Sequence, residues 1–131
     1  MPDITKVLLV DEDRNFLALL KNLFQRAGYE TATTTVPRAA IYSLDTFCPD
    51  IIITDFVMPE IRGDVLAETI KREVNAPVVI IMTALDVNVI PGGHKADGII
   101  CKDALLALLH YKPNYDELPP DDDDEKDKEK K

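Results

Sequence analysis

The 131-residue sequence lacks the features of membrane and secreted proteins. No apolar stretch approaches the roughly 20 residues of a transmembrane helix, and the N-terminal MPDITK has neither the basic start nor the apolar core of a signal peptide. The two cysteines, Cys48 and Cys101, do not make a metal-binding spacing, so we expect reduced thiols. We therefore expect a cytoplasmic protein with no segment inserted in a membrane.

The sequence also lacks an excess of positive charge. Its formal net charge is −9, and residues 119–131 carry −3 of this because they hold seven acidic residues and four lysines. The remaining −6 argues against direct binding to nucleic acid. Residues 119–131 contain nothing that could join a core, so we expect one domain over residues 1–111 and a charged, disordered tail over 112–131.

What the sequence does contain is a regular alternation of strand and helix patterns. Continuous apolar runs predict buried strands at residues 6–10, 50–54, 77–82 and 98–101. A threonine-rich run at 30–35 predicts an outer strand. Helical spacing predicts helices at residues 16–27, 37–47, 64–74 and 103–111, the first with Asp13 as N-cap and Gly28 as its stop. This order predicts an α/β fold, a doubly wound parallel sheet of five strands with helices on both faces.

The connection between the fourth and fifth predicted strands is the place where this alternation weakens. It contains Pro91, Gly92 and Gly93 in succession. A helix interior would lose roughly 3 kcal/mol to the proline and about 1 kcal/mol to each glycine. We therefore expect the fourth helix of the fold to be short or broken.

Polar side chains stand where four of the predicted strands end. Asp11 and Glu12 follow the first strand, Asp55 the third, Thr83 the fourth and Lys102 the fifth. In doubly wound sheets the carboxyl ends of the strands border the binding crevice. Clustered carboxylates are ligands that Mg²⁺ prefers together with phosphate oxygens, and a lysine ammonium supplies a point charge for a phosphoryl group. The sequence therefore predicts a site for Mg²⁺ and a phosphoryl group.

Four segments that carry these residues, VLLVDEDR, PDIIITDFVMPEIRGD, VVIIMTA and DGIICKD, resemble the receiver domain of two-component response regulators. The resemblance covers residues 6–111 and implies the flavodoxin-like strand order 2-1-3-4-5. It implies a stand-alone receiver in a phosphorelay, which a histidine kinase or phosphotransfer protein phosphorylates on Asp55 and which acts on a downstream protein target. Such a protein is a phosphoacceptor and not a turnover enzyme.

The resemblance also implies a role for each residue of the predicted site. Lys102 would neutralise the acyl phosphate on Asp55, and Thr83 would close on it after transfer. The groups that would hold Mg²⁺ are the side chains of Asp11, Glu12 and Asp55 and the backbone carbonyl of Val57. These roles agree with the chemistry, because in-line phosphoryl transfer depends on a positioned nucleophile and on charge stabilisation at the equatorial oxygens.

The chain departs from the family pattern at several positions. Ile99 stands where most receivers carry the Tyr or Phe that reports the movement of Thr83, and Glu12 is longer than the usual Asp. Thr83 and Lys102 are 19 positions apart, and this separation is a few residues shorter than is usual in the family. Asp103 stands where the family has a proline after a cis bond, so we expect a trans bond and Asp103 as a cap of the last helix. These departures keep a pseudo-receiver, a protein-binding module without phosphorylation, as an alternative.

A third interpretation starts from Asp11-Glu12-Asp13, because D-x-D after an apolar strand also resembles haloacid-dehalogenase-like phosphatases. Asp11 would then be the nucleophile and Asp13 the acid/base. Large residues follow the motif where that family has small ones, and Asp55 would have no role. Steady turnover of a phosphomonoester would support this interpretation, and a single phosphorylation of Asp55 would support the receiver.

The resemblance further implies which side chains flank the approach of water to the acyl phosphate. These are Val57 and Leu85, two residues after Asp55 and Thr83. Both are apolar and cannot orient a water molecule by hydrogen bonding. We therefore expect slow loss of the phosphoryl group.

Overall fold

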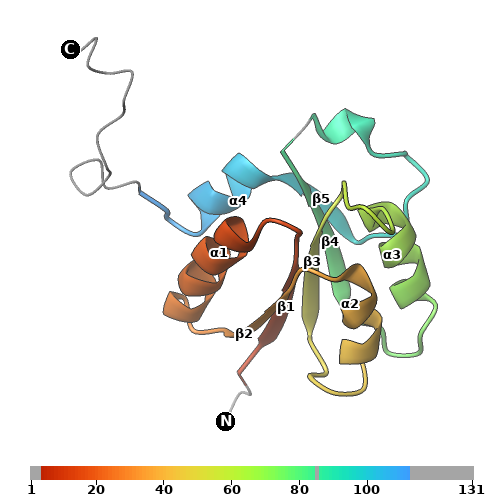
Figure 1. The fold of residues 1–131 in the computed structure, drawn as a ribbon, viewed down its shortest axis with the longest axis horizontal. Helices are drawn as coiled ribbons and strands as arrows, with labels where there is room; N and C mark the ends of the chain where they lie inside the picture. The colour runs from red at the N-terminus through yellow and green to blue at the C-terminus, as the bar shows by residue number, and fades with distance from the viewer. Residues whose placement is uncertain (1–3, 85, 113–131) are drawn as a thin grey trace.

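The computed structural model describes residues 4–84 and 86–112, and its centre is a parallel sheet. The five strands are Lys6–Val10 (β1), Glu30–Thr34 (β2), Ile51–Asp55 (β3), Val78–Thr83 (β4) and Gly98–Cys101 (β5). They lie in the order β2-β1-β3-β4-β5 (Figure 1), and all neighbours are parallel. This confirms the predicted α/β fold and strand order.

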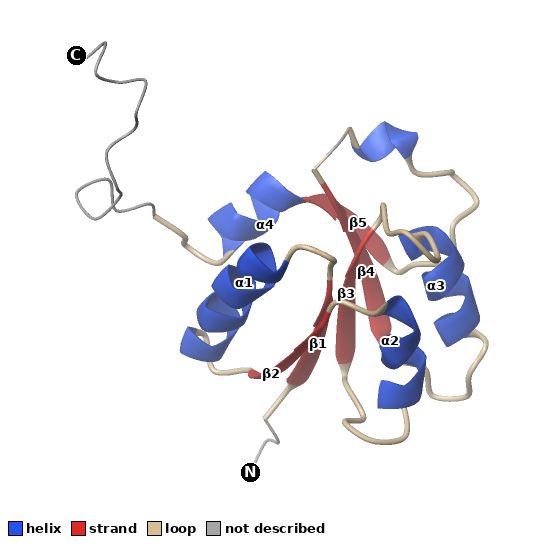
Figure 2. Cartoon of the chain, viewed as in Figure 1, coloured by secondary structure: helices blue, strands red, loops and turns tan. Residues whose placement is uncertain are grey.

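Helices cover both faces of the sheet (Figure 2). They are Arg14–Arg26 (α1), Pro37–Ser43 (α2), Gly63–Lys71 (α3) and Lys102–Leu108 (α4). Leu17 of α1 and Leu105 of α4 belong to one apolar cluster, whereas Ala40 of α2 and Leu66 of α3 belong to the other. The sheet is therefore doubly wound, as predicted. Among the described residues, no helix combines the length and the apolar content needed to cross a membrane.

The two apolar clusters meet through the central strands. In β1, Val7 and Leu9 pack toward α1 and α4, and Leu8 and Val10 pack toward α2 and α3. All four are buried. Successive side chains of a strand point to opposite faces, so a strand covered on both sides must be apolar at every position. This is why the apolar runs of the sequence located the strands to within about one residue.

The crossover from β4 to β5 contains a single turn of 3₁₀ helix, Val87–Val89 (η1), in place of a full helix. Asp86 caps this turn by accepting a hydrogen bond from the backbone N–H of Asn88 at 2.9 Å. The turn ends before Pro91, which cannot sit in a helix interior without loss of a hydrogen bond. The prediction of a short or broken fourth helix is confirmed.

The predicted caps at the helix starts had different outcomes. The Oδ1 atom of Asp13 accepts hydrogen bonds from the backbone N–H groups of Asn15 at 3.0 Å and Phe16 at 3.1 Å, which confirms Asp13 as the cap of α1. The prediction for Asp103 was wrong, because Cys101 is the N-cap of α4 and Asp103 lies inside the first turn. The helix begins one residue earlier than expected, directly after β5. The described residues contain no cis peptide bond, in agreement with the expected trans bond after Lys102.

Each helix is followed by a residue with a left-handed backbone. These residues are Gly28, Cys48, Asn75 and His110, with φ of 101°, 54°, 59° and 61°. The sequence predicted stops at Gly28, which adopts positive φ without steric cost, and at Cys48-Pro49. Three helices end three or four residues before their predicted limits: α2 at Ser43, α3 at Lys71 and α4 at Leu108. The predicted tail beyond residue 112 lies outside the described residues.

Candidate functional site

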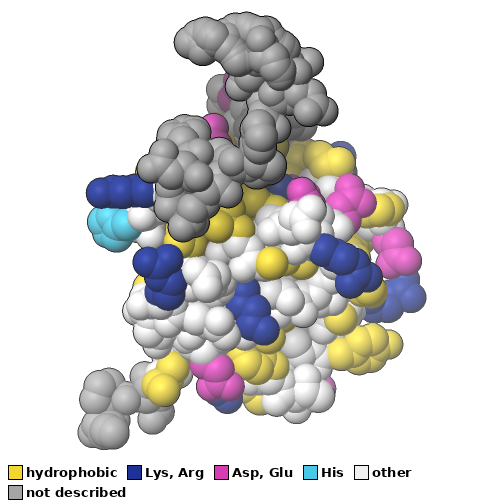
Figure 3. All heavy atoms as spheres, turned by 60° about the vertical axis from the view of Figure 1, so that its left-hand side comes forward, with side chains coloured by type: hydrophobic (Ala, Val, Ile, Leu, Met, Phe, Trp, Pro, Cys, Tyr) yellow, Lys and Arg dark blue, Asp and Glu magenta, His cyan; other side chains and the backbone are white. Residues whose placement is uncertain are grey.

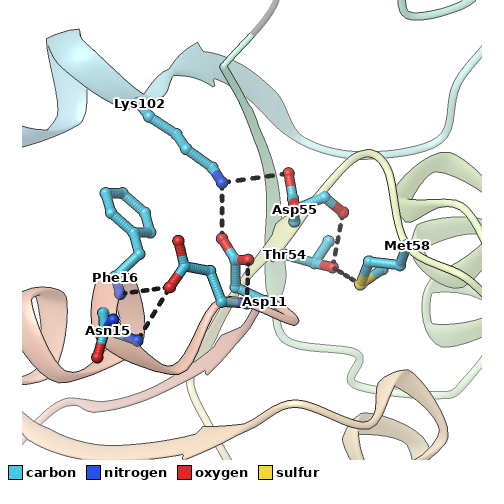
Figure 4. A network of polar contacts seen from close by, with 8 residues as sticks. Asp11, Asn15, Phe16, Thr54, Asp55, Met58 and Lys102 are labelled. Carbon is cyan, nitrogen blue, oxygen red and sulfur yellow. Dashed lines mark hydrogen bonds and ion pairs between the residues drawn. The ribbon is translucent and has the colours of Figure 1, made fainter.

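Three of the predicted side chains converge beyond the carboxyl ends of the strands. Asp11 follows β1, Asp55 ends β3, and Lys102 begins α4 directly after β5. The Nζ atom of Lys102 lies 2.7 Å from Asp11 Oδ2 and 3.6 Å from Asp55 Oδ1 (Figure 4). Because β1 and β3 are adjacent and in register, the two residues that end them lie side by side. The ammonium group of Lys102 therefore forms ion pairs with two carboxylates.

The carboxylates of this site are largely withdrawn from water. Asp11 is 1% exposed and Asp55 is 8% exposed. Besides the ammonium of Lys102, Asp11 accepts a hydrogen bond at Oδ1 from the backbone N–H of Asp13 at 2.9 Å. A buried carboxylate requires such partners, since desolvation without compensation is costly. The loop after β1 and the start of α4 together supply them.

The pKa of Asp55 is raised from 3.8 to about 6. Burial of the carboxyl group is the largest cause, and the negative charge of Asp11 is the next. The ammonium of Lys102 and the backbone N–H of Phe56 act in the opposite direction. Two neighbouring carboxylates share one ammonium, and a further cation at this place would favour the ionised form of Asp55.

The loop that follows Asp55 is held close to the strand. The hydroxyl of Thr54 donates to the carbonyl oxygen of Asp55 at 3.0 Å, and the backbone N–H of Gly63 donates to Phe56 at 2.8 Å. A Cβ atom added to Gly63 would lie 2.4 Å from the Asp55 carbonyl oxygen. Gly63 is therefore needed for the close return of the chain, which sets the backbone position of Asp55.

The structure adds one residue to the site that the sequence reasoning did not assign there. The ring centroid of Phe16 lies 4.6 Å from Lys102 Nζ, within the range of a cation–π contact (Figure 4). From the sequence, Phe16 was one of the apolar residues at helical spacing in α1. No local signal distinguishes it from them, because its partner is 86 positions away along the chain.

The remaining predicted residues lie around this centre with different exposure. Thr83 ends β4 and is buried, with Cys101 of β5 as its register partner. Glu12 is exposed, and Val57 is 52% exposed in the loop after Asp55. Ile99 pairs with Ile81 and packs against the cluster beneath α2 and α3. Leu85 lies outside the described residues.

The donor chemistry of the site fits Mg²⁺ in part. Asp11 and Asp55 supply hard oxygen ligands, and Mg²⁺ commonly binds one or two carboxylates and keeps several waters. Within residues 4–84 and 86–112, however, no three Asp, Glu, His or Cys side chains are grouped so that they could hold a metal ion. The participation of Glu12 and of the Val57 carbonyl therefore stays a prediction. Lys102 now occupies one oxygen of Asp11 that a metal could use.

Comparison with known proteins shows to which family the chain belongs. Residues 7–109 match the model of the response regulator receiver domain. The chain belongs to the response regulator receiver family. This confirms the resemblance that the sequence segments carry, and it makes the chain a receiver domain of two-component response regulators.

Curated relatives of this receiver domain match over part of their length. The chemotaxis protein CheY of Thermotoga maritima is 35% identical over 77 residues, which cover 57% of this chain and 64% of CheY. The regulatory protein AtoC of Escherichia coli is 34% identical over 85 residues, which cover 64% of this chain and 18% of AtoC. The matched regions thus span less than two thirds of these relatives.

Solved receiver structures share the fold. The response regulator TrrA of Thermotoga maritima, in complex with Mg²⁺-BeF, is 27% identical with a TM-score of 0.72, over 82% of this chain and 94% of TrrA. A CheY-like receiver domain from Methylobacillus flagellatus is only 14% identical but has a TM-score of 0.71, over 82% of this chain and 98% of that domain. The receiver fold is therefore retained where sequence identity is low.

Proposed function

We propose that this receiver domain accepts a phosphoryl group on Asp55 from a histidine kinase or a phosphotransfer protein. The observation that supports this most is the convergence of Asp55 and Asp11 on Lys102 at the carboxyl edge of the sheet. The raised pKa of Asp55 agrees with it, because perturbed carboxyl groups gather at sites that perform chemistry. The phosphorylated form then acts through a downstream protein target.

The residues of the site divide the work of the transfer. An oxygen of Asp55 attacks the phosphorus, the bond from phosphorus to the donor nitrogen breaks, and an acyl phosphate forms on Asp55. Lys102, already 3.6 Å from Asp55 Oδ1, neutralises charge on the phosphoryl oxygens. Thr83, which ends β4, would donate a hydrogen bond to the product.

Asp11 and Asp55, with Glu12 and the Val57 carbonyl, are the groups that would hold Mg²⁺. The ion would supply positive charge beside the equatorial oxygens. The magnesium complex of the related TrrA supports this assignment.

The wider setting follows from the same proposal. A stoichiometric phosphoacceptor of this kind assists its own phosphorylation and is not a turnover enzyme, and it works in the cytoplasm, where such kinases act. Direct binding to nucleic acid is not part of the proposal. On the face shown in Figure 3, lysine and arginine side chains form separate spots among hydrophobic and acidic ones, not one basic patch.

Intact-mass measurement after incubation with Mg²⁺ and acetyl phosphate or phosphoramidate tests the proposal. The wild type should gain one phosphoryl group, and Asp55→Asn should gain none. Asp45→Asn, which changes an exposed carboxylate in the turn after α2, should label like the wild type. Excess chelator should prevent labelling in every protein. Equal labelling of Asp55→Asn and the wild type would exclude Asp55 as the acceptor.

The same assay separates the alternatives. A pseudo-receiver would remain unlabelled with every donor. A phosphatase of the haloacid-dehalogenase type would turn over a phosphomonoester and depend on Asp11 as nucleophile. The structure disfavours the phosphatase, because Asp13, its required acid/base, uses its carboxylate to cap α1.

A further inference from the structure

An apolar groove of about 420 Å³ lies on the sheet face that α1 and α4 cover. No charged side chain lines it, and its walls include Phe24, Ile51, Ile80, Ile100, Leu105 and Leu109. Ile51 and Ile53 of β3 line the groove, and Ile53 precedes Asp55 by two residues, roughly 7 Å of strand, so the groove lies below the site on the same face. The groove is distinct from the site described above.

The groove exists because α4 is too short to cover this part of the sheet. α4 has 7 residues and buries only Leu105, whereas α1 has 13 residues and buries four. Beside the groove, Leu108 is 68% exposed. Ile80 and Ile100 on the strands below are only half-buried. Hydrophobic side chains also reach the surface on this side of the molecule (Figure 3).

The chain turns immediately after α4. His110 has a left-handed backbone, with φ of 61°. The backbone N–H of Tyr111 donates to the Leu106 carbonyl at 3.0 Å, and that of His110 donates to Ala107 at 3.0 Å. These bonds form the usual closing motif of a helix, so the chain leaves the axis of α4 at this point. The described residues end at Lys112, three positions after Leu109, which lines the groove.

The next residues of the chain contain two large apolar side chains. Residues 113–118 read PNYDEL, so Tyr115 and Leu118 follow Lys112 by three and six positions. An extended chain covers roughly 3.3 Å per residue, which gives a reach of about 10 Å and 20 Å. Residues 119–131 are prolines and charged residues only. Within reach of the groove, the sequence thus supplies two apolar side chains and then none.

We propose that Tyr115 and Leu118 of the same chain occupy this groove and complete the cover that α4 leaves open. A groove without charged walls accepts apolar side chains, and the acidic run from Asp121 onward then remains in water. A spacing of three lets both side chains face the same way within a single helical turn. Tyr115 is also only six positions after the groove-lining Leu109 in the chain, which favours an intramolecular contact.

Methyl NMR on the full chain with labelled isoleucine tests the proposal. Ile51, Ile80 and Ile100 report on the groove, and Ile70, buried under α3 on the opposite face, is an internal control. The double change Tyr115→Ala/Leu118→Ala should shift the three groove methyl signals and leave Ile70 in place. The matched double change Asp116→Asn/Glu117→Gln alters the same segment without loss of apolar surface and should leave all four signals unchanged.

Nuclear Overhauser contacts give the direct reading. In the wild type, Tyr115 ring protons should show contacts to the Ile80 or Ile100 methyl groups that do not weaken on dilution. Unchanged groove signals in the Tyr115→Ala/Leu118→Ala protein would overturn the proposal. So would contacts that appear only between differently labelled molecules in a mixed sample, because these would mean that a second copy fills the groove.

Discussion

The two halves of the sheet differ in the length of their crossover helices and in the burial of their strands. From β1 to β4, each crossover passes through a full helix, and β1 and β3 each bury four of their five residues. From β4 to β5, the helix described in the crossover is the 3₁₀ turn η1 of three residues, and no residue of β5 is fully buried. We call these the covered half and the open half. A short crossover suffices to connect parallel strands, but it leaves the edge strand with little to pack against.

The candidate site joins the two halves. Asp11 and Asp55 stand on the covered half, where their strands are fixed by packing on both faces. Lys102 comes from the open half, and its contacts to Asp11 and to the ring of Phe16 hold it across 91 and 86 positions of sequence. Lys102 is therefore held by contacts within the site, whereas the strand that precedes it, β5, is only half-buried.

The largest expected effect is on stability, for an Ile→Ala substitution in each half of the sheet. Ile52 and Ile99 face the same apolar cluster, but Ile52 is 0% exposed in β3 and Ile99 is half-buried in β5. Ile52→Ala should lower the free energy of unfolding by about 3–5 kcal/mol, and Ile99→Ala by about 1–2 kcal/mol. Urea denaturation measures both. Equal losses would show that the open half is as tightly packed as the covered half.

The second test removes the ammonium charge of Lys102, which the open half contributes to phosphorylation. Lys102→Met should lower the rate of phosphorylation by acetyl phosphate by about 10²–10³-fold, because the charge on the phosphoryl oxygens loses its preorganised partner. Lys95→Met changes an exposed lysine in the same half and should leave the rate unchanged. Intact mass against time gives both rates. A Lys102→Met protein that labels at the wild-type rate would show that the covered half suffices.

The third test compares how Asp55, in the covered half, and Asp97, in the open half, change the stability of the fold with pH. The folded pKa of Asp55 is raised to about 6, so its ionisation destabilises the fold as pH rises from 3.8 through 6. At pH 7.5 with a chelator present, Asp55→Asn should be more stable than the wild type by up to about 3 kcal/mol. The difference should disappear below about pH 4, since Asp55 is then neutral in both the folded and the unfolded chain.

Asp97, in the open half, should behave in the opposite way. A hydrogen bond from Lys71 lowers its pKa, and the backbone N–H of Val79 adds to this. Its contribution stabilises the fold above the unfolded pKa and is lost as pH falls through the lowered value. Asp97→Asn should therefore be less stable than the wild type at pH 7.5, by a small amount because the side chain is largely exposed. Urea denaturation at pH 7.5 and pH 4 measures both variants, and the same sign for both would contradict the assignment.

The smallest expected effect concerns the lifetime of the phosphoryl group. Val57, half exposed beside Asp55, cannot orient water by hydrogen bonding. Val57→Asn should speed loss of the phosphoryl group by about 2–10-fold, less than a full general-base effect. Val65→Asn, at an exposed position of α3, is the control and should leave the lifetime unchanged. An unchanged or longer lifetime in Val57→Asn would show that this side chain does not limit the access of water.

Prediction from the sequence succeeded where a local pattern carries the structural information. The apolar runs located the strands, Asp13 marked the start of α1, and Pro91 with its two glycines marked the shortened crossover. It failed at Asp103 and at the end of α2. At the end of α2 the backbone adopts what the packing of the whole chain requires, including left-handed φ at Cys48, a conformation for which cysteine has no strong local preference.

The residues that share an edge of the sheet follow from the sequence alone. In a parallel sheet every strand runs the same way, so the residues that end the strands, Asp11, Asp55, Thr83 and Lys102, must lie at one edge once strands and helices alternate. Which atoms meet at that edge depends on the packing of the folded chain. The nearer approach of Lys102 to Asp11 than to Asp55, the ring of Phe16 beneath the ammonium and the raised pKa of Asp55 depend on distances and burial that packing sets between segments far apart in the chain.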